Sequence, residues 1–369
     1  MSIGEMTPKE RMMAALSGKE MDRLIVSPLI LNWASRTTGI KVGEFNRNGE
    51  KMGNAHIACF KKYRHDVVYI FTTTSTLAEA MGTKMYFPDD DAPQVETPFI
   101  QSREDLKKLK PLDPEKDGRL PVYLEAAKRC VDAIGDEVFI LPVIGAPFTT
   151  SAALRGTDTF IRELYTDPEM VHTLMRATTD AAKVSIDAFV KIGTVPITVE
   201  PVATGSMIRD KHFREFVLPY LKEIYAHISS YSLPGALHIC GKTKRVIKAM
   251  SESGAAILSI DDIDLLDAKE LVGDKVCLMG NVSPADGFFK GTPEIIREMV
   301  KDCVAKAYDS PAGYIIASGC EVPLMTPHEN MIAFLEAGRE FVRLPIDKSK
   351  LESEVKVHIH RTSSEACVH

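Results

Sequence analysis

The 369-residue chain carries no marked excess of charge of either sign and no long apolar run. Its 45 lysines and arginines against 51 aspartates and glutamates leave a formal net charge of -6, so a basic surface for nucleic acid has no electrostatic support. No stretch approaches the roughly 18 uninterrupted apolar residues that a helix needs to cross a bilayer. We therefore expect neither a nucleic-acid partner nor a membrane partner.

Cysteine is also sparse: seven residues, an odd number, are scattered along the chain. Disulfide-stapled secreted domains are short and dense in paired cysteines, so that class is excluded. The first six residues, Met-Ser-Ile-Gly-Glu-Met, lack the basic and apolar stretches of a secretory signal. These features together predict a cytoplasmic location.

Short apolar runs bounded by Gly, Pro, Asn or Asp recur along the chain, with helix signals between them. Thr7-Pro8-Lys9-Glu10 combines an N-cap, a proline at the first helical position and a capping-box glutamate. Asp167-Pro168-Glu169 repeats that pattern before a helical periodicity over 170–191. The eight apolar runs cover residues 24–30, 66–71, 138–144, 195–202, 236–240, 256–260, 275–279 and 313–318.

Strands that alternate with helices predict an α/β protein with a parallel sheet. Eight nearly continuous apolar strands favour a closed (β/α)8 TIM barrel over an open doubly wound sheet, because strands buried on both faces lose their alternation. We expect a single barrel domain over 1–346, with an N-terminal helical extension over 1–22. A long insertion after the second strand, 72–120, is expected over the active face, and 347–369 reads as a polar tail.

Polar residues follow the expected strands at the ends where TIM-barrel active sites are built. His238 and Cys240 end the fifth strand, and their i, i+2 spacing turns both side chains to one face. Cys320 follows the eighth strand, which barrel closure brings across the same mouth. One imidazole and two thiolates are the ligand set of a zinc site with an open fourth position. The sequence therefore predicts a catalytic zinc ion held by His238, Cys240 and Cys320.

Three further segments carry a family resemblance: 213–222 (Phe-Arg-Glu-Phe-Val-Leu-Pro-Tyr-Leu-Lys), Gly280-Asn281-Val282 with Gly291-Thr292-Pro293-Glu294, and Thr326-Pro327-His328-Glu329-Asn330. With them the chain resembles the uroporphyrinogen decarboxylase superfamily up to about residue 344. True decarboxylases carry Arg-Gln-Ala-Gly-Arg-Tyr after the first strand and Gly-His-Gly after the last. This chain has Leu-Asn-Trp-Ala-Ser and Ser-Gly-Cys-Glu at those places. The His-x-Cys and Gly-Cys pair is instead similar to the zinc-dependent methylcobamide:coenzyme M methyltransferase branch.

That branch implies transfer of a methyl group from a methyl-Co(III) corrinoid protein to a thiol such as coenzyme M. An ordinary thiol is mostly protonated at neutral pH, and zinc binding deprotonates it. Corrinoid-binding domains use an Asp-x-His-x-x-Gly segment, whereas the nearest match here, 210–215, ends in Glu. The methylcobamide donor is thus expected on a separate protein. Two alternatives stay open: a porphyrinogen decarboxylase that works without metal, and a non-catalytic corrinoid-partner binding protein.

Four other residues near the strand ends are candidates for a role in the site. The resemblance and its place after the sixth strand suggest Asp261 as a resting fourth zinc ligand, with a helix N-cap as the alternative. Glu200, at the end of the fourth strand, is a candidate to orient a ligand histidine or a polar substrate, or to serve the structure. Asn281 is a candidate substrate-binding residue. Trp33, the single tryptophan, is expected either to contact substrate or corrinoid or to pack in the core.

Overall fold

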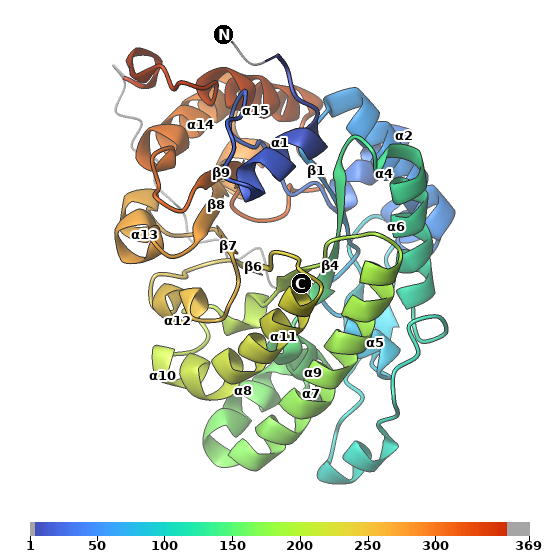
Figure 1. Cartoon of the computed structure of the whole chain (residues 1–369). Coiled ribbons are helices and arrows are strands. Elements are labelled where there is room, and N and C mark those ends of the chain that lie inside the picture. The colour runs from blue at the N-terminus through green and yellow to red at the C-terminus, as the bar shows by residue number, and fades with distance from the viewer. Residues whose placement is uncertain (1–3, 353–369) are drawn as a thin grey trace.

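A curled parallel sheet forms the centre of the molecule, and helices surround it (Figure 1). The computed structural model describes residues 4–352. Seven parallel strands pair in the order β1-β4-β5-β6-β7-β8-β9, and β2 and β3 form a separate antiparallel hairpin. The strands are β1 Val67–Ile70, β2 Lys84–Tyr86, β3 Gln94–Thr97, β4 Phe139–Gly145, β5 Ile197–Val199, β6 Ala236–Ile239, β7 Ile257–Ile260, β8 Cys277–Val282 and β9 Tyr314–Ser318.

Helices or helical turns connect the barrel strands, as expected for a TIM-barrel topology. The α-helices are α1 Pro8–Leu16, α2 Ser35–Thr38, α3 Val42–Phe45, α4 Gly49–Tyr63, α5 Thr76–Ala80, α6 Leu120–Ile134, α7 Pro147–Arg155, α8 Thr157–Thr166, α9 Pro168–Lys191, α10 Asp210–His212, α11 Leu218–Ser230, α12 Ile247–Ser251, α13 Leu265–Val272, α14 Pro293–Ala307 and α15 His328–Phe341. Short 3-10 or π-helical turns are η1 Asn32–Ala34, η2 Arg103–Lys108, η3 Pro201–Ala203, η4 Phe213–Val217, η5 Pro284–Phe289 and η6 Lys348–Leu351.

Two of the helix starts predicted from sequence are confirmed in atomic detail. The Thr7 side chain accepts from the Glu10 backbone N–H at the start of α1, and the Glu10 carboxylate reaches back to the Thr7 N–H. Asp167 caps α9 by accepting from the Met170 N–H at 3.2 Å. Both caps satisfy backbone donors that the first helical turn leaves without an intrahelical partner.

The first predicted strand, 24–30, is wrong as a regular strand. Only Val26 forms a parallel bridge, to Ile316 of β9. Toward β1, the Val26 N–H donates to the Asp66 side chain at 2.7 Å and not to a strand backbone. Beyond it, Pro28 has no N–H to give to a ladder, and the Ile30 N–H turns back to the Pro28 carbonyl. The segment still bonds to β9 and to the residue before β1, so it occupies the place of the eighth barrel strand without strand geometry.

Side-chain alternation along the strands separates two layers of the core. Val67, Tyr69 and Phe71 belong to a cluster inside the barrel, whereas Val68 and Ile70 pack outward against the helices. On β6, Ala236 belongs to the inner cluster and Leu237 to the outer one. Since alternate residues share a face, His238 and Cys240 continue the inner row of Ala236 toward the carboxyl end of the strand.

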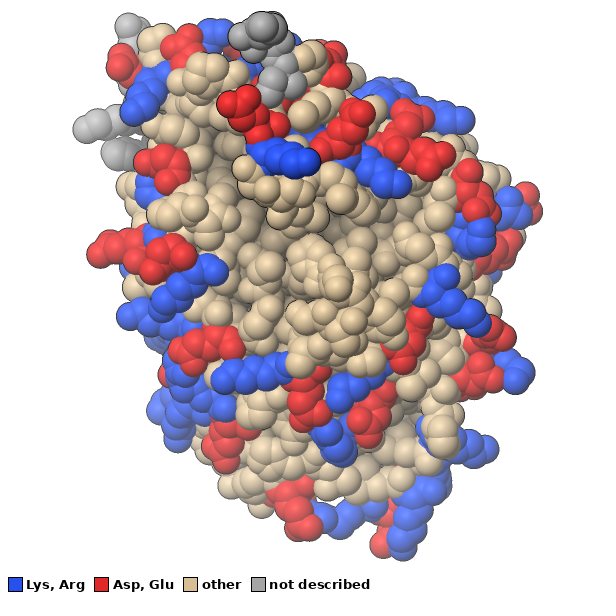
Figure 2. Space-filling view, in the orientation of Figure 1, with Lys and Arg blue, Asp and Glu red and all other residues tan. Residues whose placement is uncertain are grey.

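The segment expected as an insertion, 72–120, carries α5, the β2–β3 hairpin and η2. Its residues 72–74, together with 91 and 92 from the hairpin connection, reach the central cavity described below. The predicted polar tail begins with η6 and lies, from residue 353 on, outside the described residues. Within 4–352, no helix combines the length and the apolar character required to span a membrane. On the face drawn in Figure 2, basic and acidic side chains are intermixed.

Candidate metal centre

The carboxyl ends of the strands surround a cavity of about 380 Å³. Its inner wall is apolar and comes from the barrel interior, including Leu29, Phe71 and Val199. Its outer wall is made by the last residues of the strands and by the loops that follow them. This wall carries most of the polar residues of the lining, including His238, Cys240, Asp261, Asp262, Asn281, Cys320 and Glu321. A concave site with an apolar interior and convergent polar groups is the usual form of a small-molecule site.

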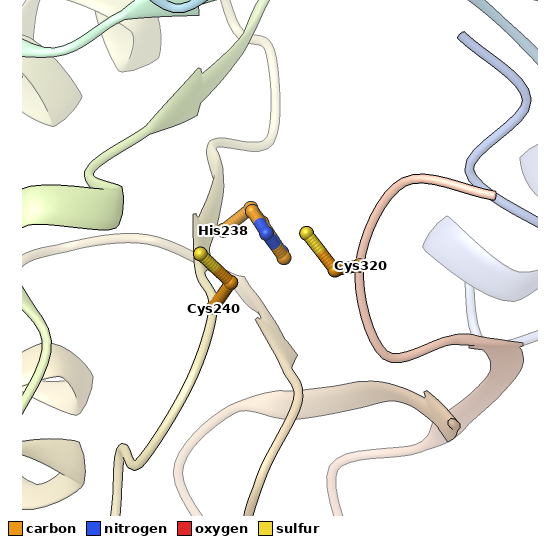
Figure 3. Close-up of side chains that lie close together, drawn as sticks. All are labelled: His238, Cys240 and Cys320. Atoms are coloured by element: carbon orange, nitrogen blue, oxygen red, sulfur yellow. The ribbon is translucent and has the colours of Figure 1, made fainter. Parts of the chain in front are cut away.

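His238, Cys240 and Cys320 meet in this cavity as the sequence predicted. Their three ligand atoms all lie within 4.8 Å of one another, which allows them to hold one metal ion. Figure 3 shows His238 and Cys240 at the end of β6 and Cys320 on the loop after β9, with the His238 ring and the Cys320 sulfur turned toward each other. His238 and Cys240 are buried, and Cys320 is partly exposed. None of the three is in a disulfide, and the donor set fits zinc.

The end of β6 is shaped so that both of its candidate ligands face the cavity. His238 Nδ1 lies 3.0 Å from the Ser259 hydroxyl on the neighbouring strand β7, which leaves Nε2 as the nitrogen for a metal. Gly241 has φ +69°, a left-handed conformation in which a side chain would be strained. The chain therefore turns sharply directly after Cys240. Ser259 was not singled out in the sequence, because a serine within an apolar run carries no distinguishing signal.

Asp261 ties the two cysteine-bearing loops together. Its Oδ2 accepts from the Gly241 N–H at 2.9 Å, next to Cys240. A Cβ built on Gly319, next to Cys320, would lie only 2.4 Å from Asp261 Oδ1, so this close approach requires glycine. The N-cap of α13 is Asp264 rather than Asp261, which removes the N-cap alternative for Asp261. Asp261 as a fourth ligand remains a prediction, since the three-ligand group does not include it.

Asn281 lines the cavity but lies within β8, because this strand continues to Val282 instead of ending at residue 279 as expected. Its side-chain amide donates to the carbonyls of Asp261 and Ile263, each at 2.7 Å. Asn281 thus holds the loop after β7 in place. A direct contact with substrate remains a prediction.

Glu200 directly follows β5 and is not among the residues that line the cavity, because its side chain is directed to the start of α7. Its two carboxylate oxygens accept from the backbone N–H groups of Phe148 and Thr149, at 2.9 and 2.7 Å, in the first turn of α7. Complete burial raises the pKa of Glu200 to about 7, against the lowering effect of these two hydrogen bonds. The contacts favour the structural role over the catalytic one.

Trp33 is fully buried, and its indole N–H donates to the Thr326 carbonyl at 2.9 Å. Its ring packs against His328, with centroids 5.1 Å apart, and it does not line the cavity. The preceding residue does: Asn32 donates from its backbone N–H and its amide to Glu321 Oε1, at 3.0 and 3.1 Å. This link between the first segment and the loop of Cys320 was not recognised in the sequence.

Comparison with known proteins places this fold and site in a family. The model of the family described as uroporphyrinogen decarboxylase (URO-D) matches residues 7–341. The chain belongs to this family, and the resemblance noted in the sequence is confirmed.

The relatives include proteins of two activities at almost equal identity. A methylated-thiol–coenzyme M methyltransferase of Methanosarcina mazei is 28% identical, over 92% of this chain and 90% of the relative. A uroporphyrinogen decarboxylase of Cellvibrio japonicus is 27% identical, over 90% and 97%. Among solved structures, a methyltransferase from Methanosarcina mazei matches with a TM-score of 0.83 and 25% identity, over 91% of this chain and 99% of that one. The TIM-barrel fold is thereby confirmed, whereas identity alone does not separate the two activities.

Proposed function

We propose that this protein is a zinc-dependent methyltransferase that moves a methyl group from a methyl-Co(III) corrinoid, carried by a separate protein, to a thiol. The observation that carries the proposal is the convergence of His238, Cys240 and Cys320 within 4.8 Å in the central cavity. The relatives named as coenzyme M methyltransferases support it and make coenzyme M one candidate acceptor.

The donor set favours alkyl transfer over hydrolysis. Zinc held by one neutral imidazole and two thiolates has no formal charge, and at such a site it would deprotonate a thiol while leaving the sulfur electron-rich. Three neutral histidines would instead leave a dipositive site that suits the polarisation of water. In the reaction, the Co–C bond breaks with its electron pair left on cobalt, which becomes Co(I). The methyl group forms a new C–S bond with the acceptor.

Residues around the candidate ligands position them, and the barrel interior excludes water from one side of the cavity. Ser259 orients His238 by its hydrogen bond to Nδ1, and Asp261 holds the turn after Cys240. The apolar interior of the barrel closes the cavity from below and keeps water from that side. A cavity of about 380 Å³ suits a small acceptor, so a corrinoid macrocycle has to approach across the mouth. A partner protein that presents the corrinoid over the mouth satisfies this geometry.

The decarboxylase alternative is disfavoured by the charge of the cavity. None of the described lining residues is a lysine or an arginine, whereas five are acidic: Asp91, Asp261, Asp262, Asp286 and Glu321. A uroporphyrinogen carries eight carboxylates of its own, and binding it would need cationic partners. A decarboxylase would also retain its turnover after thorough chelation of metal. A purely binding protein would form a complex with a corrinoid protein without methylating any thiol.

Zinc content and methyl transfer test the proposal in a matched pair of variants. We expect about one zinc per chain in the purified wild type, at least a tenfold weaker zinc affinity in Cys320→Ser, and loss of thiol-dependent demethylation of methylcobalamin followed by absorbance. Cys277→Ser is the control, because Cys277 is likewise partly exposed but lies at the beginning of β8. Unchanged zinc binding in Cys320→Ser would falsify the site.

A further inference from the structure

The charge of the cavity bears on which thiol accepts the methyl group, and this inference rests on the proposed function. All ionisable residues that line the cavity, apart from the three candidate metal ligands, are acidic. With a formally neutral zinc site, each bound thiolate adds one further negative charge. An acceptor with its own anionic group would therefore meet a lining whose charged residues are acidic.

Four basic residues that lie near the lining segments in sequence or in contact are not themselves part of the lining. Lys242 and Arg245 follow Cys240 but are exposed, and neither lines the cavity. Lys290 lies 4.0 Å from Asp286, with its side chain 64% exposed. Arg36 donates to the carbonyls of Leu324 and Thr326 instead of lining the cavity. A sulfonate or carboxylate inside the cavity would find no lysine or arginine among the described residues that line it.

Most of the lining carboxylates already accept hydrogen bonds from the protein. Asp261 accepts from Gly241, Glu321 accepts from Asn32, and Asp91 accepts from the Ala92 N–H. Asp286 belongs to the cap of η5 and contacts Ser283 and Lys290. These contacts fix the loops of the outer wall, and they occupy the oxygen atoms involved.

Asp262 differs from the other four. It is half-buried, and its backbone N–H donates to the Gly241 carbonyl at 3.0 Å, which fixes it beside the turn after Cys240. Within the described part of the chain its carboxylate has no hydrogen-bond or ion-pair partner. An acidic residue of the cavity lining, on a backbone held next to a candidate zinc ligand, is available to pair with a charged group on the acceptor.

We infer that the methyl acceptor is a thiol with a positively charged group, such as an amine, and that Asp262 pairs with this group while the sulfur reaches the metal site. An ammonium group on the acceptor would offset the negative charge of Asp262, whereas an anionic group on the acceptor would add to the negative charge of the lining. Acceptors with a terminal sulfonate, coenzyme M among them, are accordingly disfavoured in this protein despite the names of its relatives.

Three ethanethiols that differ only in their terminal group make the test direct: cysteamine is cationic, 2-mercaptoethanol neutral and coenzyme M anionic. We would measure the dissociation constant of each for the zinc-loaded protein by calorimetry, and kcat/KM with methylcobalamin as donor. We expect cysteamine to bind at least tenfold more tightly than coenzyme M, and its kcat/KM to exceed that of coenzyme M by a similar factor. Because salt screens charge, a higher salt concentration should reduce the difference between cysteamine and coenzyme M in both binding and kcat/KM.

Asp262→Asn assigns the effect to one side chain. Differences in intrinsic thiol reactivity cancel when the cysteamine to coenzyme M ratio is compared between wild type and variant, and we expect the ratio to fall at least fivefold. Glu336→Gln, an exposed position outside the cavity, is the charge-matched control and should leave the ratio unchanged.

The outcomes separate this inference from the proposed function. Methylation of all three thiols with coenzyme M as the best acceptor would overturn the inference and leave the methyltransferase intact. A preference for cysteamine that Asp262→Asn does not reduce would overturn the role of Asp262. No methylation of any thiol, together with no thiol binding, would overturn the proposed function and this inference with it.

Discussion

At the scale of single residues, the candidate ligands depend on ordinary polar neighbours for their orientation. The clearest case is Ser259, which is fully buried and lies 3.0 Å from His238 Nδ1. A ligand histidine that donates its second N–H to such a partner keeps one tautomer and one ring orientation. In the proposed metal centre, Ser259 would therefore contribute to metal affinity without contacting the metal.

Substitution of Ser259 by alanine tests this role. The variant leaves the Nδ1–H of His238 without its partner, and we expect a zinc affinity about 10- to 100-fold weaker. Competition with a chromophoric chelator measures the change. Ser259→Thr keeps a hydroxyl and should retain most of the affinity. Ser253→Ala removes an equally buried hydroxyl away from the site and serves as control. An affinity in Ser259→Ala equal to that of the control would rule out the orienting role.

The sequence predicted which residues would meet, but not what holds them. His238, Cys240 and Cys320 could be found because i, i+2 spacing and the ends of barrel strands constrain where side chains point. Ser259 and the Asn32–Glu321 contact could not, since serine in an apolar run and asparagine before a tryptophan are common without any function. Glu200 was placed correctly at a strand end, yet its carboxylate turns to the first turn of α7.

At the scale of elements, the segment 24–30 shows how a buried ionic group can replace strand pairing. Asp66 lies just before β1 and is 1% exposed. It accepts from Arg11 of α1, from Arg23 and from the Val26 N–H, at 2.6 to 2.9 Å. The Asp66 carboxylate thus connects the N-terminal helix α1 and the segment 24–30 to the start of β1. A buried charge held by two arginines is stable only while its partners are present.

Asp66→Asn should therefore be strongly destabilising. The amide cannot neutralise Arg11 and Arg23, both of which are buried, so we expect a loss of about 3–5 kcal/mol in the free energy of unfolding. Urea denaturation measures it. Asp132→Asn removes an exposed partner of Lys128 in α6 and should cost less than about 1 kcal/mol. A comparable loss in the two variants would contradict the proposed role of Asp66.

The segment 24–30 is also the one apolar run whose predicted strand does not form. Seven of the eight apolar runs become barrel strands because continuous apolar runs between helices have few other buried arrangements. The first run has the same apolar composition, but Pro28 interrupts the ladder and the Asp66 side chain takes the backbone donor of Val26. A contact between residues 40 positions apart leaves no periodic trace in the sequence.

At the scale of the whole molecule, the candidate metal centre connects strands that do not pair with each other. His238 belongs to β6, Cys240 directly follows β6 and Cys320 follows β9, with β7 and β8 between these two strands in the sheet. A metal bound to all three would cross-link two sides of the barrel mouth. Since a ligand that binds only the native state stabilises it by mass action, zinc should raise the stability of the entire domain.

Removal of zinc provides the test at this scale. At a free zinc concentration about 1,000 times the dissociation constant, binding contributes about 4 kcal/mol, so we expect a strong chelator to lower the Tm by roughly 5 °C or more. Scanning calorimetry of the protein before chelation, after chelation and after reloading with zinc measures the shift. Cys320→Ser should show little response, because the cross-link from the β9 side is missing, whereas Cys277→Ser should respond like the wild type. A chelator effect of equal size in Cys320→Ser would place the stabilising metal outside this centre.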